Sequence, residues 1–219
     1  MKKNNLFLCV LITTVTMLSC NKDNFNYPAG KVGISTIVYF PAIAINGDRL
    51  TIITLGQSYT DPGATATLGS STASYTTTGS VNVNTPGVYG ITYTAVNSQG
   101  NAVSDWRTVV VIGNDVTAND FSGTYARTSN GVTSTWTKTG NGIYSVENPG
   151  GAGVGVGETV IAVNYTGTKI TIPRQIAPAF GSEVSSSNET YTATPSPATY
   201  SWVFHNAAYG TSLRTFVKQ

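Results

Sequence analysis

Cysteine and histidine are nearly absent from this sequence. Its 219 residues include two cysteines, Cys9 and Cys20, and a single histidine, His205. A zinc site needs several nitrogen or sulfur ligands, and a Cys-His nucleophilic pair needs both residue types. The sequence therefore predicts no metal site, no cofactor and no thiol chemistry.

Charged residues are also scarce, at 10% of the chain, with 12 Lys and Arg against 10 Asp and Glu. Lys2 and Lys3 belong to a leader described below, and their loss brings the formal net charge from +2 to 0. Nucleic-acid binding requires a basic footprint. The neutral remainder excludes nucleic acid as a partner.

The long apolar run of the chain lies at its N-terminus, from Leu6 to Leu18. It follows Lys2 and Lys3, which is the layout of a secretory signal. As a helix it would span roughly 20 Å, whereas a bilayer core is about 30 Å thick. It is therefore too short for a good transmembrane anchor, and we interpret residues 1–19 as a signal peptide.

Cys20 stands at the end of this leader, in Leu18-Ser19-Cys20, which resembles the lipobox of bacterial lipoproteins. The resemblance implies that Cys20 is acylated and anchors the mature chain in the membrane. The alternative is an ordinary signal peptide with a free cysteine near the cut. Residues 21–24 resemble the polar tag of Bacteroidetes surface lipoproteins, which implies an outer-membrane protein at the cell surface, with the inner leaflet as the alternative. Residues 20–33 predict a polar tether.

Beyond the leader, no stretch shows the sustained apolar spacing of a long helix. Short apolar or alternating runs are separated by turn residues, which predicts an all-β chain. In a first domain, residues 34–114, the expected strands are 34–40, 42–45, 49–55, 81–84, 88–96 and 106–112. Their spacing predicts a β-sandwich.

Two segments of this domain, TLGQSYTDPGATAT (54–67) and TPGVYGITYTAVNSQGNAVSDWRTVVV (85–111), resemble the Ig-like domain of bacterial surface proteins, also found in some insecticidal crystal proteins. The resemblance covers residues 38–112 and implies a sandwich with neither a disulfide nor catalytic residues. Asp61 lies in an Asp-Pro-Gly turn, where we interpret it as a turn-capping carboxylate, with metal ligation as the alternative.

Residues 113–120 carry two Asn-Asp pairs and predict the junction between two domains. Calcium binding is the alternative to ordinary linker turns. Calcium takes six to eight oxygen ligands, and the acids near this junction supply too few of them. The sequence therefore favours linker turns.

Residues 119–219 predict a second β-domain. Its expected strands are 123–128, 133–138, 142–147, 159–165, 169–173, 190–194, 199–205 and 212–217. This pattern predicts an antiparallel β-barrel or a second sandwich. The segments 121–125, 142–148 and 214–218 resemble C-terminal domains that follow the Ig-like module in Bacteroidetes lipoproteins, a resemblance that implies the architecture and no mechanism.

Catalytic motifs are absent from this second domain. The glycine run 148–158 lacks the Gly-Lys-Ser/Thr ending of a phosphate-binding loop, and no Gly-x-Ser-x-Gly elbow accompanies His205. Glu147 and Glu158 flank the glycine run and could face one another as a hydrolase pair, but neither lies in a recognisable motif. The sequence predicts a protein that is not an enzyme.

Aromatic residues are concentrated in the second domain. Exposed rings can hold the apolar faces of sugars, whereas buried rings form β cores. The candidate ligand-binding residues are Trp136, Tyr144, Trp202 and Tyr209. Trp136 is favoured because its neighbours Thr135 and Thr137 make a polar strand. We expect a monomer that captures a polysaccharide at the cell surface, with the Ig-like domain as spacer; the alternative is a structural or adhesive protein that binds a protein partner.

Overall fold

The computed structural model describes residues 28–29, 31–32, 35–153, 157–179, 181–207 and 209–219. The chain divides into two units between Tyr39 and Phe40. In the first unit, strands β1 (Lys31–Val32) and β2 (Ser35–Thr36) form a short antiparallel pair. The predicted signal peptide and Cys20 lie outside the described residues. No helix within the described ranges is long and apolar enough to cross a membrane.

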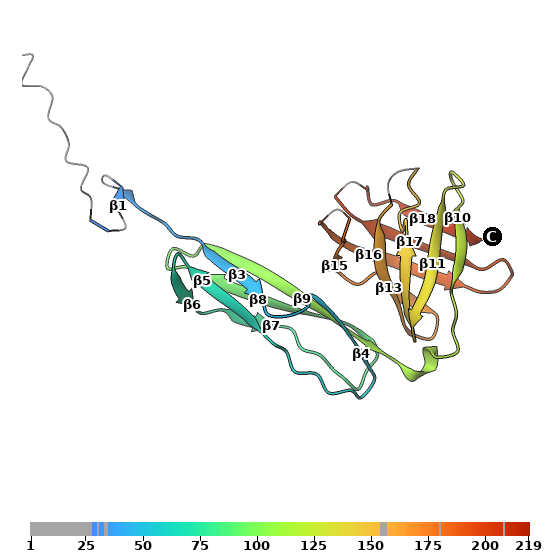
Figure 1. Ribbon diagram of the computed structural model, residues 1–219, viewed down its shortest axis with the longest axis horizontal. Helices are drawn as coiled ribbons and strands as arrows, with labels where there is room; N and C mark the ends of the chain where they lie inside the picture. The colour runs from blue at the N-terminus through green and yellow to red at the C-terminus, as the bar shows by residue number, and fades with distance from the viewer. Residues whose placement is uncertain (1–27, 30, 33–34, 154–156, 180, 208) are drawn as a thin grey trace, which may run out of the picture. The chain divides into compact units, whose positions relative to one another are not determined.

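The second unit begins with a β-sandwich of two sheets (Figure 1). One sheet has the order β3 (Pro41–Ile45), β5 (Ala64–Leu68) and β6 (Ser71–Ala73). The other has the order β4 (Leu50–Thr54), β9 (Ala102–Ile112), β8 (Gly87–Val96) and β7 (Thr76–Thr78). β4 pairs with β9 in parallel, and the remaining pairs of the sandwich are antiparallel. The predicted sandwich is confirmed.

Some strand predictions for this sandwich were wrong in detail. Residues 37–40 and 81–84 form no strand. β5, β6 and β7 were not predicted as strands, because their Thr- and Ser-rich sequences carry little apolar signal. β5 and β7 form because their backbones pair with β3 and β8, whose apolar side chains contribute to the sandwich core, and β6 in turn pairs with β5.

A buried arginine organises one end of the sandwich. Arg107 is 1% exposed and donates to the backbone oxygens of Asp48 and, at 2.5 Å, Asn46. Its Nε lies 3.2 Å from Asp61 Oδ1, which also accepts a 2.6 Å hydrogen bond from the hydroxyl of Tyr93. Asp61 therefore holds a buried cation in place in addition to its position in a turn.

The second half of β9, residues 106–112, is buried on both faces, which explains the continuous apolar run at its end. Val109 and Val111 pack into the core of the sandwich. Val110 and Ile112 alternate with them and pack instead with Val116 and Val163. Val116 belongs to the 3-10 helix η2 (Asn114–Val116), and Val163 belongs to β13 (Thr159–Thr166) in the following domain. The last strand of the sandwich therefore shares a small core with the following domain.

The rest of the chain forms a nine-stranded antiparallel sheet that curls into a barrel (Figure 1). Its order is β14 (Lys169–Thr171), β13 (Thr159–Thr166), β12 (Ile143–Glu147), β11 (Thr133–Gly140), β10 (Gly123–Arg127), β18 (Leu213–Lys218), β17 (Thr199–His205), β16 (Glu183–Thr192) and β15 (Gln175–Ile176). The sheet curls until the chain at β14 meets β16, where Ser186 N donates to Ile172 O at 3.0 Å. Of the two predicted alternatives, the structure has the barrel-like one.

The barrel strands follow the alternation of apolar residues, with two exceptions. β15 and the first half of β16 were not predicted, and the latter reads Glu-Val-Ser-Ser-Ser-Asn. Polar residues occupy this half because it faces the segment around Thr171 rather than an apolar layer. Ser186 bonds to Thr171 and Ile172, and Glu189, just beyond this half, also bonds to Thr171. Backbone pairing defines the strand here, and a hydrophobic pattern cannot reveal it.

Candidate functional site

The selected tryptophans lie inside the barrel. Trp136 is 2% exposed, and both Trp202 and Tyr144 are 0% exposed. The rings of Trp136 and Trp202 stack with their centroids 5.4 Å apart, and the Tyr200 ring contacts both. The expectation that these residues present exposed faces was wrong. Thr135 and Thr137 face outward on the same strand, so their polarity indicated the outer face of β11 while Trp136 points into the barrel.

Tyr209, the fourth candidate, is partly buried at one end of the barrel. Its ring lies edge-on to Phe204, with centroids 5.4 Å apart, and the guanidinium of Arg214 lies 4.6 Å from its centroid. Burial raises the pKa of Tyr209, and the charge of Arg214 opposes that shift. One face of this ring is therefore already occupied by a cation.

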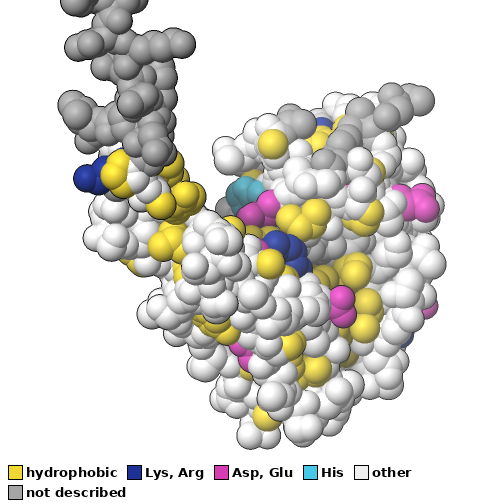
Figure 2. All heavy atoms as spheres, turned by 60° about the vertical axis from the view of Figure 1, so that its left-hand side comes forward, with side chains coloured by type: hydrophobic (Ala, Val, Ile, Leu, Met, Phe, Trp, Pro, Cys, Tyr) yellow, Lys and Arg dark blue, Asp and Glu magenta, His cyan; other side chains and the backbone are white. Residues whose placement is uncertain are grey.

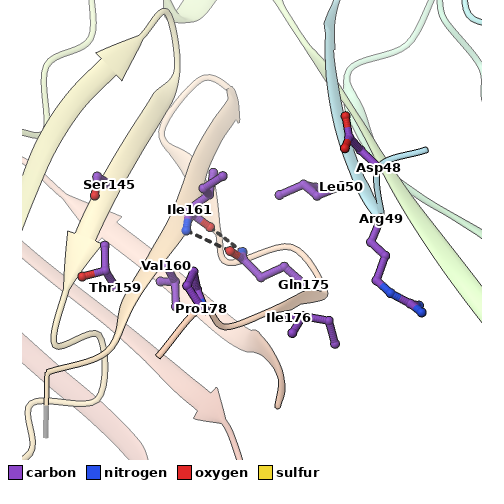
Figure 3. A pocket seen from close by; sticks show the side chains of 10 residues that line it. All are labelled: Asp48, Arg49, Leu50, Ser145, Thr159, Val160, Ile161, Gln175, Ile176 and Pro178. Carbon is purple, nitrogen blue, oxygen red and sulfur yellow. Dashed lines mark hydrogen bonds between the residues drawn. The ribbon is translucent and has the colours of Figure 1, made fainter. Parts of the chain in front are cut away.

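A pocket of about 340 Å³ lies between the sandwich and the barrel, and we call it the interdomain pocket (Figure 3). Its lining residues are Asp48, Arg49, Leu50, Ser145, Thr159, Val160, Ile161, Gln175, Ile176 and Pro178. Leu50 points across the pocket towards Ile161 (Figure 3). Ile161 and Ile176 line the same pocket and are 39% and 40% exposed. The pocket therefore presents an apolar floor to solvent.

Gln175 fixes one wall of this pocket. Its side-chain amide bonds to both the N–H and the C=O of Ile161, at 2.9 and 2.7 Å, and also donates to Pro173 O at 3.0 Å. These bonds join the short strand β15 to β13, with which it shares no backbone pairing in the sheet order. The wall that carries Ile176 is thus held by side-chain hydrogen bonds.

The charge at the pocket's edge is largely neutralised within the protein. Arg49 pairs with both carboxylate oxygens of Asp105, one at 2.8 Å. Burial would raise the pKa of Asp105, but the hydrogen bonds and charge of Arg49 hold it below its ordinary value. The same pair raises the pKa of Arg49. On the face shown in Figure 2, charged side chains are sparse.

A stacked tryptophan joins the two domains beside the pocket. Two guanidinium groups lie over the Trp106 ring, that of Arg174 at 4.1 Å and that of Arg49 at 5.4 Å from its centroid. Arg174 comes from the barrel, and its backbone oxygen accepts a 2.9 Å hydrogen bond from Thr108 Oγ1. Because Gln175 and Ile176 follow Arg174 directly, this contact positions the lining of the interdomain pocket. Trp106 is a packing residue at the domain junction.

The start of the glycine run is packed against one end of the barrel. Trp202 Nε1 donates to Pro149 O at 2.9 Å, and Arg214 Nη1 donates to Gly150 O at 2.5 Å. A Cβ on Gly151 would lie 2.8 Å from a carbon of Phe216, so only glycine fits there. In the described part of this run, Pro149, Gly150 and Gly151 are buried, whereas Gly153 and Gly157 are exposed.

Residues considered for catalysis are not assembled into a site. His205 Nε2 bonds to Ser187 Oγ at 2.7 Å, but among the described residues no carboxylate contacts the histidine. Glu147 is exposed whereas Glu158 is 1% exposed, so the two do not face one another. Within the described ranges, no three His, Cys, Asp or Glu side chains gather as a metal-binding group.

The two acids of the junction, Asp115 and Asp120, accept hydrogen bonds that hold turns in place. Asp115 Oδ2 accepts hydrogen bonds from Gly167 N at 2.7 Å and Thr166 Oγ1 at 2.9 Å. Asp120 Oδ1 accepts a 2.9 Å bond from Ser122 N. Asp120 caps a turn of the junction itself, whereas Asp115 binds the turn between β13 and β14 and so ties the junction to the barrel.

Sequence reasoning missed the interdomain pocket entirely. Its residues come from a turn and the start of β4 in the sandwich, and from three strands and a turn of the barrel, and none belongs to a motif. A faint signal existed in Ile161 and Ile176, which are apolar residues at outward-facing positions of their strands. Only the packing of the two domains brings them together.

Comparisons with known proteins identify the first domain. Residues 43–111 match the family model described as "Bacterial surface protein, Ig-like domain", which confirms the resemblance found in the sequence over about a third of the chain. Among solved structures, the chain is similar to a lipoprotein from Bacteroides thetaiotaomicron, at 24% identity and a TM-score of 0.36, over 82% of this chain and 100% of that one. A search of curated proteins found no match.

Proposed function

We propose that this chain is a non-catalytic, lipid-anchored protein of the bacterial cell surface that captures a glycan in the interdomain pocket. Two observations support the cellular setting: the lipobox-like Cys20 behind a short leader, and the Ig-like domain at residues 43–111. We place the anchor in the outer membrane of a member of the Bacteroidetes. The Ig-like domain separates the barrel from the lipid.

The single observation that carries the ligand assignment is the composition of the interdomain pocket. Leu50, Ile161 and Ile176 supply an apolar floor, and Asp48, Ser145 and Thr159 supply polar groups beside it. A sugar ring offers apolar C–H faces and a rim of hydroxyls, which suits such a mixed lining. Ligand pockets favour domain interfaces and span about 300–1,000 Å³, and this one has about 340 Å³.

The ligand suited to this pocket is neutral. Arg49 is neutralised by Asp105, and Arg174 by Glu183 through bonds of 2.6 and 2.7 Å. An acidic glycan would have to break one of these pairs to gain a cation. We therefore propose a neutral polysaccharide chain, one sugar of which enters the pocket.

A second candidate function is a structural or adhesive role with a protein partner. The burial of Trp136, Tyr144 and Trp202 favours it, because it removes the aromatic platform that a distal sugar-binding face would need. In this alternative, the exposed Ile161 and Ile176 form part of a protein interface.

The test is a glycan-array screen of the chain from Asn21 onwards, which omits Cys20. We expect binding to one class of neutral polysaccharide. Ile176→Ser should weaken that binding at least tenfold, whereas Val96→Ser, an apolar-to-polar change at a more exposed position of the sandwich, should leave it unchanged. Silence across plant, host and microbial glycans, or equal loss in both variants, would refute glycan capture in this pocket and turn the search to protein partners in the cell envelope.

A further inference from the structure

Arg214 lies at an inward-facing position of the barrel. It lies two residues before Phe216, on the same face of β18, and pairs across the sheet with Trp202. All three side chains are buried. Arg214 is only 7% exposed. Its Nη1 donates to Gly150 O, and its Nε is buried without a hydrogen-bond partner. A buried guanidinium with an unused donor is costly unless something else satisfies it.

A second arginine accompanies it at the same end of the barrel. Arg127 ends β10, two residues after the fully buried Tyr125, so both side chains lie on the inner face of the strand. Arg127 is partly exposed, and its Nη1 makes a long 3.4 Å bond to Gly151 O. Burial, followed by the nearby charge of Arg127, lowers the pKa of Arg214. The two cations therefore repel each other.

Among the described residues, no acidic side chain forms an ion pair with either arginine. In the described part of the chain, the ion pairs within 4.0 Å join Arg49 to Asp105, Arg107 to Asp61 and Arg174 to Glu183. Neither Arg127 nor Arg214 takes part in one. The carboxylate of Glu158 is buried nearby and influences Tyr209, but its Oε1 accepts a 3.4 Å bond from Ala179 N and its Oε2 has no partner. This end of the barrel therefore holds an excess of one positive charge among these three groups.

We propose that this end of the barrel binds an oxyanion, a carboxylate or sulfate group, between the guanidinium groups of Arg127 and Arg214. The forked donors of arginine match the paired oxygens of such a group. Arg127 is accessible to solvent, so the anion reaches the pair from outside, and the unused Nε of Arg214 supplies an inner donor. A Cβ on Gly150 would lie 2.9 Å from Arg214 Nη1, so glycine lets the backbone approach this close to the cation. The site is separate from the interdomain pocket and does not depend on its function.

An NMR titration tests the proposal directly. The mature chain, carrying Cys20→Ser and expressed without its leader, is labelled with ¹⁵N, and the arginine Nε–H signals are followed as sodium sulfate is added. Sodium chloride at equal ionic strength is the reference. We expect the signals of Arg127 and Arg214 to shift saturably with sulfate alone. Shifts that stay linear in concentration, or that are equal in chloride, would overturn the proposal.

A matched pair of variants adds a second test. Arg127→Gln removes one member of the pair, whereas Lys169→Gln removes a charge from an exposed position on β14. Sulfate stabilises proteins in general, so the comparison is between variants. At ten times its dissociation constant, an anion that binds only the folded state raises the folded-to-unfolded ratio about tenfold. We expect this gain above the general effect in the wild type and in Lys169→Gln, and its loss in Arg127→Gln. An identical sulfate response in both variants would overturn the proposal.

Separate titrations with three anions distinguish the possible sources of the oxyanion. An oligomer of galacturonic acid, galacturonate monomer and sulfate are titrated separately against the same Nε–H signals. A lower half-saturation concentration for the oligomer identifies an acidic saccharide as the ligand class. Equal values for oligomer and monomer identify a free small anion. Failure of all three to saturate would overturn the proposal.

Discussion

Replacing Trp136 by alanine tests the interior of the barrel. Trp136 is 2% exposed, and its ring lies 5.1 to 6.2 Å, centroid to centroid, from the rings of Tyr125, Tyr144, Tyr200 and Trp202. Truncating a buried tryptophan costs about 3–5 kcal/mol in lost burial and residual cavity. A domain's whole free energy of unfolding is about 5–15 kcal/mol. Trp136→Ala is therefore expected to remove a large fraction of the stability of the barrel.

The assay is urea unfolding followed by near-ultraviolet circular dichroism. Trp136→Ala should lower the free energy of unfolding by about 3–5 kcal/mol and the Tm by more than about 10 °C. Leu213→Ala, at an exposed position of β18, should change it by less than about 0.5 kcal/mol. A loss below about 1 kcal/mol for Trp136→Ala with an unchanged m value would refute the burial argument and return Trp136 to the surface as a ligand candidate.

Three further predictions concern the sandwich and the domain junction. Arg107→Met should lower the free energy of unfolding by about 3–5 kcal/mol, because Asp61 and the backbone carbonyls lose a buried cation. Urea unfolding measures this loss, and a value under about 1 kcal/mol would contradict a stabilising role of the Arg107 contacts. Hydrogen bonds from Gly167 N and Thr166 lower the pKa of Asp115, so its contribution to stability is present above the ordinary value of 3.8 and is lost as pH falls below it. Tm measured from pH 6 to pH 2 should therefore fall less steeply below pH 4 in Asp115→Asn, and parallel curves would count against the cap. Arg174→Ala removes the contact with the Trp106 ring and should therefore increase amide hydrogen exchange in β15 while leaving exchange in β8 unchanged. The same change of exchange rate in both strands would show that Trp106 does not position the pocket wall.

The sandwich could be predicted from sequence because its signals are local. Asn-Gly and Asp-Pro-Gly turns and the alternation in β8 each act within a few residues, so they are legible without knowledge of the fold. Val88–Val96 alternates as predicted, with Ile91, Tyr93 and Ala95 buried. The eight predicted barrel strands follow for the same reason, whereas the polar half of β16 depends on a partner distant in sequence.

The candidate aromatics show where local reasoning stops. Alternation places Trp136 opposite its threonine neighbours, but the pattern is the same whether the polar face or the apolar face of the strand binds a ligand. Closure of the sheet decides the matter, because the inner face of a small barrel is filled by side chains. The sequence alone could not show that β10 and β18 would pair and enclose these rings.

The sequence by itself determined the all-β class, the Ig-like sandwich and the place of the lipobox-like cysteine, since each depends on short-range patterns of residue type. The tertiary structure alone decided which aromatic residues are buried, where the two domains leave a pocket, and that Arg127 and Arg214 bond to neighbouring glycine carbonyls at one end of the barrel. Those features join residues from strands that are far apart in the chain. Their proximity is a consequence of strand order and sheet curvature, which no short segment encodes.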